Sequence, residues 1–257
     1  MFCRFKNYAQ SPLKTALLQE VFMGRPSMTE EQIDQMRIRL IQATREMMNE
    51  NGIESVSIRN LGQRLGINSA SVYRYFADID ELITFACMTC LEAYVDELID
   101  LEIPAELADR TYNMEFYLKC WEIFCNHAFR NPEYFNILFF SRHSDELDRI
   151  IEQYYRLFPR DLNKFKDNQQ EMLTRSDVHN RNAKILEPII EETNARRISG
   201  QSDKPVISKS AADMINDMTV SYFYALLIEM MGDDQILAEK QTERLMQANW
   251  YWMTQLL

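Results

Sequence analysis

The segment Ser57–Phe76, SIRNLGQRLGINSASVYRYF, constrains this chain most, because it contains two short helical patterns separated by a tight turn. Ser57 can cap the first helix, and Gly66 can end it, since glycine enters the left-handed conformation at little cost. Gly62 provides a place for close helix approach, and Asn68 can cap the second helix. This arrangement predicts a helix-turn-helix, whose second helix enters the major groove of DNA.

The second helix of this motif carries side chains that can reach a duplex. We expect Ser69, Ala70 and Arg74 to face base edges, with Arg74 suited to guanine. Tyrosine and arginine side chains nearby suit phosphate contacts. The predicted DNA-binding residues are Arg59, Asn68, Ser69, Ala70, Tyr73, Arg74 and Tyr75.

The sequence around the motif adds a family pattern. An amphipathic helix, TEEQIDQMRIRLIQATREMMNENGIESV, precedes it, and an acidic DEL follows it. From about Thr29 to Leu82, this order resembles the tetracycline-repressor (TetR) family of bacterial transcriptional regulators. The resemblance implies a homodimer that binds double-stranded, palindromic operator DNA, and a larger helical domain that binds a small-molecule effector.

One departure from the family pattern concerns charge. Members usually carry a lysine just after the recognition helix, where this chain reads Ala77-Asp78-Ile79-Asp80. DNA affinity would then depend more on the arginines of the domain, which are Arg37, Arg39, Arg59, Arg64 and Arg74. The alternative is an all-helical ligand-binding or interaction protein that has lost DNA binding.

The 257 residues suffice for two domains with separate cores. We expect an all-α protein with an extension over residues 1–23, a helix-turn-helix domain over 24–79, and an effector-binding and dimerisation domain over 80–257. Met23-Gly24-Arg25-Pro26 resembles the usual start of family members, so the preceding residues either lie upstream of the functional start or form a basic arm. The net charge of −11 argues against nonspecific coating of nucleic acid, although a local basic face remains compatible with it.

The remainder of the chain shows helical periodicity, with proline and glycine near the breaks. The predicted helices cover 80–101, 105–130, 132–142, 145–158, 166–197, 208–231 and 234–256. The polar run from Asp161 to Asn182 is predicted to be a loop or an exposed helix extension. The last two helices carry apolar faces that favour a four-helix bundle between two subunits. Those faces comprise Met214, Ile215, Met218, Tyr222 and Leu226, and Ile236, Leu245, Trp252, Met253 and Leu256.

Aromatic residues recur at helical spacing in the second domain. Most are expected to form a core, but a few can line an apolar effector cavity between helices. The candidates are Tyr117, Trp121, Phe124, Phe135, Phe139 and Tyr155. Arg142, His143 and Glu122 are alternatives for contact with the polar group of a ligand, although surface positions suit them better.

Other functional classes find little support. The sequence has no nucleophile elbow, phosphate-binding loop, dinucleotide fingerprint or zinc-protease motif, so we expect no enzyme activity and no cofactor. Five cysteines predict free thiols, and Cys87 and Cys90 lack the partners of a metal site. No apolar run is long enough to span a bilayer, and the first residues lack a signal-peptide pattern. The expected protein is a cytoplasmic, ligand-responsive regulator, most simply a repressor.

Overall fold

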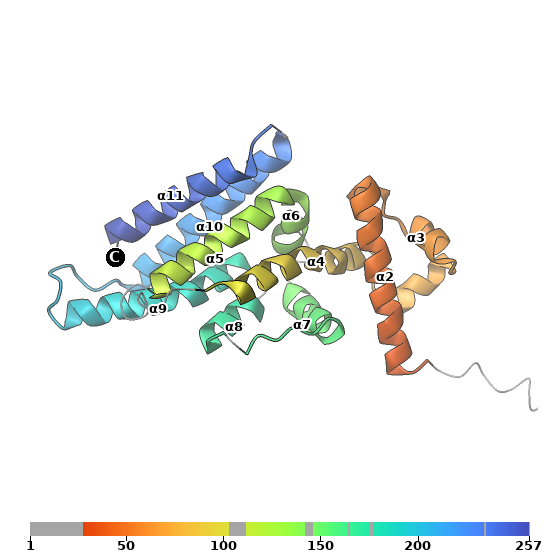
Figure 1. The fold of residues 1–257 in the computed structure, drawn as a ribbon, viewed down its shortest axis with the longest axis horizontal. Coiled ribbons are helices and arrows are strands. Elements are labelled where there is room, and N and C mark those ends of the chain that lie inside the picture. The colour runs from red at the N-terminus through yellow and green to blue at the C-terminus, as the bar shows by residue number, and fades with distance from the viewer. Residues whose placement is uncertain are drawn as a thin grey trace, which may run out of the picture.

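Every regular element of the described chain is a helix, which confirms the all-α fold class. A small N-terminal head stands at one end of a larger helical body, and helix α4 runs from one into the other (Figure 1). The predicted extension, and with it the start at Met23, lies outside the described residues. The computed structural model describes residues 28–102, 112–141, 146–163, 165–174, 177–233 and 235–256.

The head begins with α2 (Glu30–Asn51), which starts at a capping box. The Thr29 hydroxyl accepts a hydrogen bond from the Gln32 N–H at 3.3 Å, and the Gln32 side chain accepts one from the Thr29 N–H at 3.0 Å. Gly52, with φ at 77°, ends the helix and leads into the 3₁₀ turn η1 (Ile53–Ser55). This long helix supports the rest of the head.

The first helix of the motif, α3 (Ile58–Leu65), forms as the sequence predicts. The Ser57 hydroxyl caps it by accepting a backbone N–H at 3.2 Å. Gly66 ends it in the left-handed conformation, with φ at 67°. Gly62 is buried, and a Cβ atom there would lie only 2.9 Å from Ser69 Oγ, which confirms the close approach.

The second helix, η2 (Ser69–Arg74), is a 3₁₀ helix rather than the α-helix that the sequence predicted. The Ser71 N–H donates to the Asn68 carbonyl at 2.8 Å, and the Tyr75 N–H to the Val72 carbonyl at 2.9 Å, which are both bonds across three residues. Serine and valine are weak helix formers, because serine competes for backbone partners and valine loses side-chain freedom. The segment therefore forms a more tightly wound 3₁₀ helix instead of a short α-helix.

The helices of the body lie close to their predicted positions, although the start at Ala105 falls outside the described residues. The prediction of one helix over 166–197 was wrong, because the segment forms two. They are α4 (Ile79–Asp100), α5 (Tyr112–Arg130), α6 (Pro132–Phe140), α7 (Leu147–Leu157), α8 (Asp167–Thr174), α9 (Val178–Ile198), α10 (Lys209–Gly232) and α11 (Ala238–Leu256).

The break between α8 and α9 has a local cause. Asp177 caps α9, since its carboxylate accepts the Asn180 N–H at 2.7 Å. The run from Asp161 to Asn182 is not an exposed loop or extension, because Met172 and Asn182 within it are buried in the body. The average polarity of the run concealed these inward positions.

Phe124 on α5 occupies the centre of the body. Its ring centroid lies 5.2–5.7 Å from the centroids of five other aromatic rings on four helices. These rings belong to Tyr94, Trp121, Phe135, Phe139 and Phe223. The expected aromatic core is therefore present, and its edge-on contacts are the geometry that aromatic pairs prefer.

The last two helices pack side by side along the body (Figure 1). Several residues predicted for subunit pairing instead face the core of their own chain, namely Ile215, Leu226, Leu245 and Met253. Tyr222 and Trp252 contact each other, with ring centroids 6.0 Å apart. Amphipathic periodicity identifies an apolar face but does not identify which surface covers it.

The described cysteines are free thiols. Cys87, Cys120 and Cys125 are buried, and burial raises the pKa of the Cys90 thiol to about 11. A protonated thiol is a poor nucleophile and metal ligand. In the described ranges there is also no cluster of potential metal ligands, and no helix has the length and apolar character needed to cross a membrane.

The close contact at Gly62 predicts that adding one methyl group there lowers the stability of the head. In Gly62→Ala the new Cβ would meet Ser69 Oγ at 2.9 Å and the Ile67 carbonyl oxygen at 3.0 Å. We expect the head to lose about 1–3 kcal/mol of unfolding free energy, measured by urea denaturation. Gly232→Ala is the control, because nothing lies within 4 Å of that Cβ. Equal stability of the two variants would contradict this packing.

Candidate DNA-binding face and effector cavity

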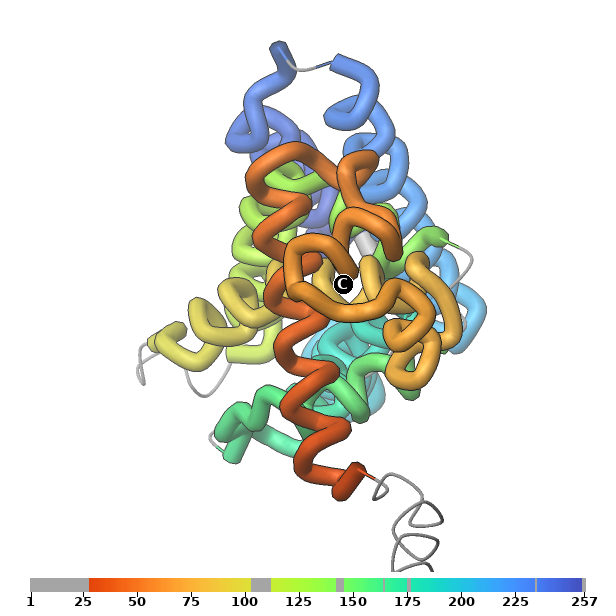
Figure 2. Tube along the Cα trace, turned by 90° about the vertical axis from the view of Figure 1, so that its right-hand side faces the viewer, coloured from red at the N-terminus to blue at the C-terminus, as the bar shows by residue number. Residues whose placement is uncertain are grey.

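The helix-turn-helix presents an exposed surface at the end of the molecule. Figure 2 views that end directly, with the head in front of the body. Ala70, Tyr73 and Arg74 on η2 are exposed, and Tyr73 retains 59% of its surface. Arg59 on α3 is exposed as well. Neither Arg59 nor Arg74 forms an ion pair with a described carboxylate, so both charges face solvent.

Three other predicted contact residues also hold the motif together. The Asn68 side chain accepts the Ala70 N–H at 2.9 Å, and Ser69 Oγ lies against Gly62. The Tyr75 hydroxyl donates to Met28 Sδ at 3.3 Å. Ser69 and Tyr75 are half-buried. Roles in DNA binding remain predictions for these residues.

Arg64 forms ion pairs within the head. Its guanidinium donates to Glu50 at 2.8 Å and to Glu46 at 2.9 Å, which joins α3 to α2. Hydrogen bonds from Arg64 lower the pKa of Glu50. Two carboxylates neutralise this arginine, so it contributes less to a basic surface than its charge alone suggests.

The acidic residues after the motif have a local function as well. Asp78 caps α4, where its carboxylate accepts the Glu81 N–H at 2.8 Å. A carboxylate at a helix N-terminus is favoured by the helix dipole. The departure from the usual lysine therefore stabilises the junction between head and body.

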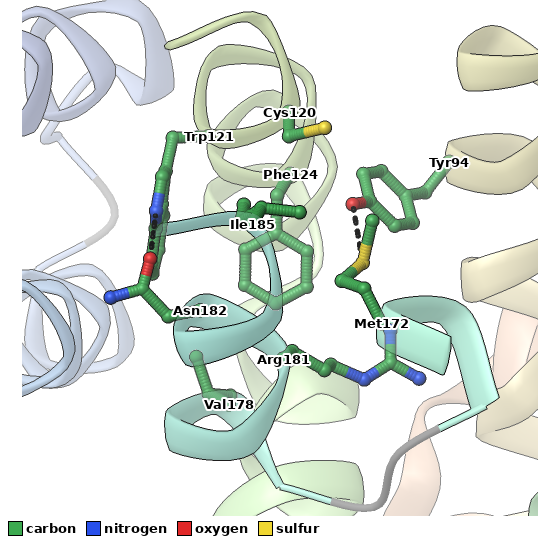
Figure 3. A pocket seen from close by; sticks show the side chains of 9 residues that line it. All are labelled: Tyr94, Cys120, Trp121, Phe124, Met172, Val178, Arg181, Asn182 and Ile185. Carbon is green, nitrogen blue, oxygen red and sulfur yellow. Dashed lines mark hydrogen bonds between the residues drawn. The ribbon is translucent and has the colours of Figure 1, made fainter. Parts of the chain in front are cut away.

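A small cavity lies inside the body between α4, α5, α8 and α9 (Figure 3). It has a volume of about 20 Å³, which is room for about one water molecule. The lining residues are Tyr94, Cys120, Trp121, Phe124, Met172, Val178, Arg181, Asn182 and Ile185.

The sequence identified part of this wall. Trp121 and Phe124 line the cavity, whereas Phe135 and Phe139 pack against Phe124. Tyr117 is fully buried but is not among the lining residues. The roles of these aromatic residues in ligand binding stay predictions.

The remaining residues predicted for effector binding either do not line the cavity or lie outside the described residues. Tyr155 is placed on α7, where burial raises its pKa and the charge of Arg181 opposes that shift. Glu122 forms a surface ion pair with Lys119 at 2.6 Å. Arg142 and His143 lie outside the described residues.

Sequence reasoning missed the polar side of the cavity. Arg181 and Asn182 fall within the polar run, and Tyr94 falls on a helix where no candidate was sought. A signal was nevertheless present, because Val178, Arg181 and Ile185 recur at helical spacing and share a face. The flanking apolar residues indicate that this face of α9 points inward.

Trp121 and Asn182 form a fixed part of the wall. The indole N–H of Trp121 donates to Asn182 Oδ1 at 2.8 Å, and Asn182 Nδ2 donates to Asn216 Oδ1 at 2.7 Å. Figure 3 shows the first of these bonds along one side of the cavity. Because each polar group has a partner, this wall is rigid and satisfied.

Two ion pairs join helix α7 to the head. Arg149 donates to Glu81 at 2.7 Å, and Glu81 also accepts the Ala77 N–H at 2.5 Å. Further along α7, Arg156 holds both carboxylate oxygens of Asp34 on α2, at 2.8 and 2.9 Å. The head is thus fastened to α7 as well as to α4.

These features define a class of protein, in which a helix-turn-helix DNA-binding domain is followed by a larger helical domain. The sequence matches the family model for bacterial regulatory proteins, tetR family, over residues 40–84. That segment includes the whole helix-turn-helix and the start of α4. The similarity to the tetR family that this match shows therefore lies in the head.

Solved structures with a similar chain trace include FadR from Thermus thermophilus, described as a TetR-family transcriptional repressor in complex with lauroyl-CoA. It is 12% identical, with a TM-score of 0.47, over 84% of this chain and 94% of its own. A second structure, described as that of a regulatory protein, SCO4313, is 15% identical, with a TM-score of 0.44, over 87% of this chain and 98% of its own. No curated protein matches the sequence.

The bond between Trp121 and Asn182 predicts how the cavity wall responds to substitution. Trp121→Phe keeps most of the aromatic packing but leaves Asn182 Oδ1 without its donor. We expect a loss of about 1–3 kcal/mol in unfolding free energy, since a buried acceptor is left unpaired. Tyr73→Phe, at an exposed position of the head, should be nearly neutral in the same denaturation experiment. Neutral results at both positions would remove Trp121 from the structural wall.

Proposed function

We propose that this protein is a ligand-responsive transcriptional regulator that binds palindromic operator DNA as a homodimer, and that it acts as a repressor. The observation that carries the proposal is the capped helix-turn-helix with Tyr73 and Arg74 exposed at the end of the molecule. A cytoplasmic location goes with this function, because the operator is there.

In this proposal η2 and the adjoining part of α3 read the operator. Ala70 and Arg74 face base edges together with Ser69, whereas Arg59 and Tyr73 contact phosphates with Asn68 and Tyr75 nearby. Arg74 is best suited to guanine, because its planar guanidinium can donate two parallel hydrogen bonds. The phosphate contacts fix the register of the head on the duplex.

An exposed stripe on α10 supports dimerisation. Met214, Tyr224, Ile228 and Met231 are exposed, and the last three follow one another at spacings of four and three residues. The polar residues Asp217 and Ser221 occupy the corresponding positions between Met214 and Tyr224. Trp250 and Tyr251 add exposed aromatic surface on the adjacent helix α11. Apolar stripes of this spacing are typical of helix pairs that bury them against another helix.

The route from cavity to DNA runs through α7 and α4. Tyr94 of α4 lines the cavity, and α7 contacts both α4 and α8, which carry lining residues. The ion pairs of Arg149 and Arg156 carry a displacement of α7 to the head. Ligand binding then favours a spacing of the two heads that no longer fits the operator, which requires different ligand affinities in the two states.

A specific observation favours the alternative of a helical protein without DNA binding. Arg64 is neutralised within the head, and acidic residues occupy the usual place of a phosphate-binding lysine. The exposed pair Arg59 and Arg74 argues against this alternative. An experiment with DNA separates the two.

The decisive experiment selects binding sites from random double-stranded DNA and then measures affinity for the selected site. Arg74→Ala should weaken binding by about 1–3 kcal/mol, roughly 5- to 150-fold, and should relax the preference at one base pair. Arg64→Ala is the matched control, because its charge is paired within the head, so we expect lower stability with the same base preference. If Arg74→Ala and Tyr73→Phe both leave affinity unchanged, the assigned DNA face is wrong, and failure to select any site supports the alternative.

The dimer is tested by a charge placed in the apolar stripe. Ile228→Glu would bury an unpaired carboxylate in the proposed interface, so light scattering should show a monomer where the wild type is a dimer. Operator affinity should fall together with dimerisation. Ala77→Glu, an exposed substitution in the head, is the control and should remain dimeric. A monomeric wild type at micromolar concentration would refute the interface.

A further inference from the structure

Two residues of the largely apolar cavity lining, Tyr94 and Arg181, carry hydrogen-bond donors. Tyr94 is 2% exposed, and its hydroxyl has Met172 Sδ at 3.8 Å as its hydrogen-bond partner among the described residues. A thioether is a weak acceptor. Burial raises the pKa of Tyr94, so the hydroxyl keeps its proton at neutral pH and can donate it to a better acceptor.

Arg181 brings a positive charge to the same side of the cavity. It is 5% exposed and lies in the first turn of α9, where the charges of Asp177 and Asp148 act on it. Its guanidinium donates to the Leu173 carbonyl at 3.1 Å and lies 5.2 Å from the centre of the Phe139 ring. In Figure 3 the side chain extends beneath Phe124 toward Met172.

The opposite wall has no comparable group to offer. Asn182 Oδ1 already accepts the Trp121 indole N–H, and Asn182 Nδ2 donates to Asn216. None of the described lining residues is a carboxylate, and Arg181 is the only one among them with a formal charge. The lining is therefore largely apolar, and its one charged residue, Arg181, lies on the same side as the Tyr94 hydroxyl.

We propose that this cavity binds a small organic carboxylate, with its carboxylate group at Arg181 and the Tyr94 hydroxyl and its apolar body against Trp121, Phe124 and Ile185. The inference deepens the proposed function, because it rests on the cavity being the effector site and adds the chemical class of the effector. One guanidinium and one hydroxyl match a monoanion. A phosphate dianion would bring two negative charges, whereas Arg181 is the only described lining residue with a formal positive charge.

Met172 supplies the room that the ligand needs. The cavity holds only about 20 Å³, so a ligand must displace a side chain. Met172 is unbranched and adapts easily, and its movement also releases the Tyr94 hydroxyl from its weak partner. A carboxylate oxygen then replaces a thioether as the acceptor, which strengthens that hydrogen bond.

The experiment compares acids with neutral molecules of the same shape. Benzoate, phenylacetate and 3-phenylpropanoate are titrated into the full-length protein alongside the corresponding primary amides, and binding is measured by thermal shift and calorimetry. We expect at least one acid to raise the melting temperature with increasing concentration and to bind about tenfold or more tightly than its amide, as expected for a charge-assisted hydrogen bond. Operator affinity is measured in the same samples without ligand.

Two variants locate the carboxylate. Tyr94→Phe removes only the hydroxyl, and it should weaken acid binding about tenfold while leaving amide binding nearly unchanged. Tyr154→Phe is the matched control, because Tyr154 is also buried but does not line the cavity. Arg181→Gln should abolish the preference for acid over amide, and Tyr94→Phe remains informative if Arg181→Gln fails to fold.

The outcomes separate this inference from the proposed function. Amides that bind as tightly as acids, or acid affinity unchanged in Tyr94→Phe and in folded Arg181→Gln, would overturn the assignment of a carboxylate. Absence of binding by every acid at millimolar concentration would also overturn it. Operator binding by the ligand-free wild type supports the DNA-binding function in each of these cases, whereas its absence counts against that function and not against the cavity chemistry.

Discussion

The contacts of Phe124 hold the body together and shape its cavity at the same time. Its ring meets rings from α4, α5, α6 and α10, so these helices cannot shift independently. One edge of this cluster is the cavity wall. Ligand binding and stability therefore depend on the same packed side chains, and a closely packed interior passes a local displacement on to its neighbours. The cluster thereby connects the cavity to α4, which enters the head.

Local cues made the head predictable. The caps at Ser57 and Asn68 and the left-handed Gly66 each act within a few residues, so their residue types suffice to place the elements. The winding of η2 did not follow from such cues, because the choice between α and 3₁₀ bonding depends on small differences in backbone geometry. The partners of Arg64 were also hidden, since Glu46 and Glu50 lie more than a dozen residues away in the sequence.

The cavity was predictable only on its aromatic side. Trp121 and Phe124 belong to a strongly periodic stripe of α5, which identifies them as inward-facing. Arg181 was not predictable in this way. A charged residue usually lies at the surface, and the polar run around Arg181 favoured the same interpretation. Its burial depends on α6 and α8 packing over it, which is a tertiary effect. Reading the apolar neighbours Val178 and Ile185 as a helical face would have recovered its orientation.

The arginines of α7 lie near the surface, with side chains 43% exposed at Arg149 and 52% exposed at Arg156. Dissolved ions screen pairs of this kind, whereas they screen charges less among buried side chains such as those that line the cavity. In the proposed regulator, salt would weaken the mechanical link between cavity and head while leaving effector affinity nearly constant. A rise in salt concentration would then weaken the response to the effector without changing which effector is bound. Responsiveness and recognition would thus reside in separate residues, so that substitutions on α7 could alter one and spare the other.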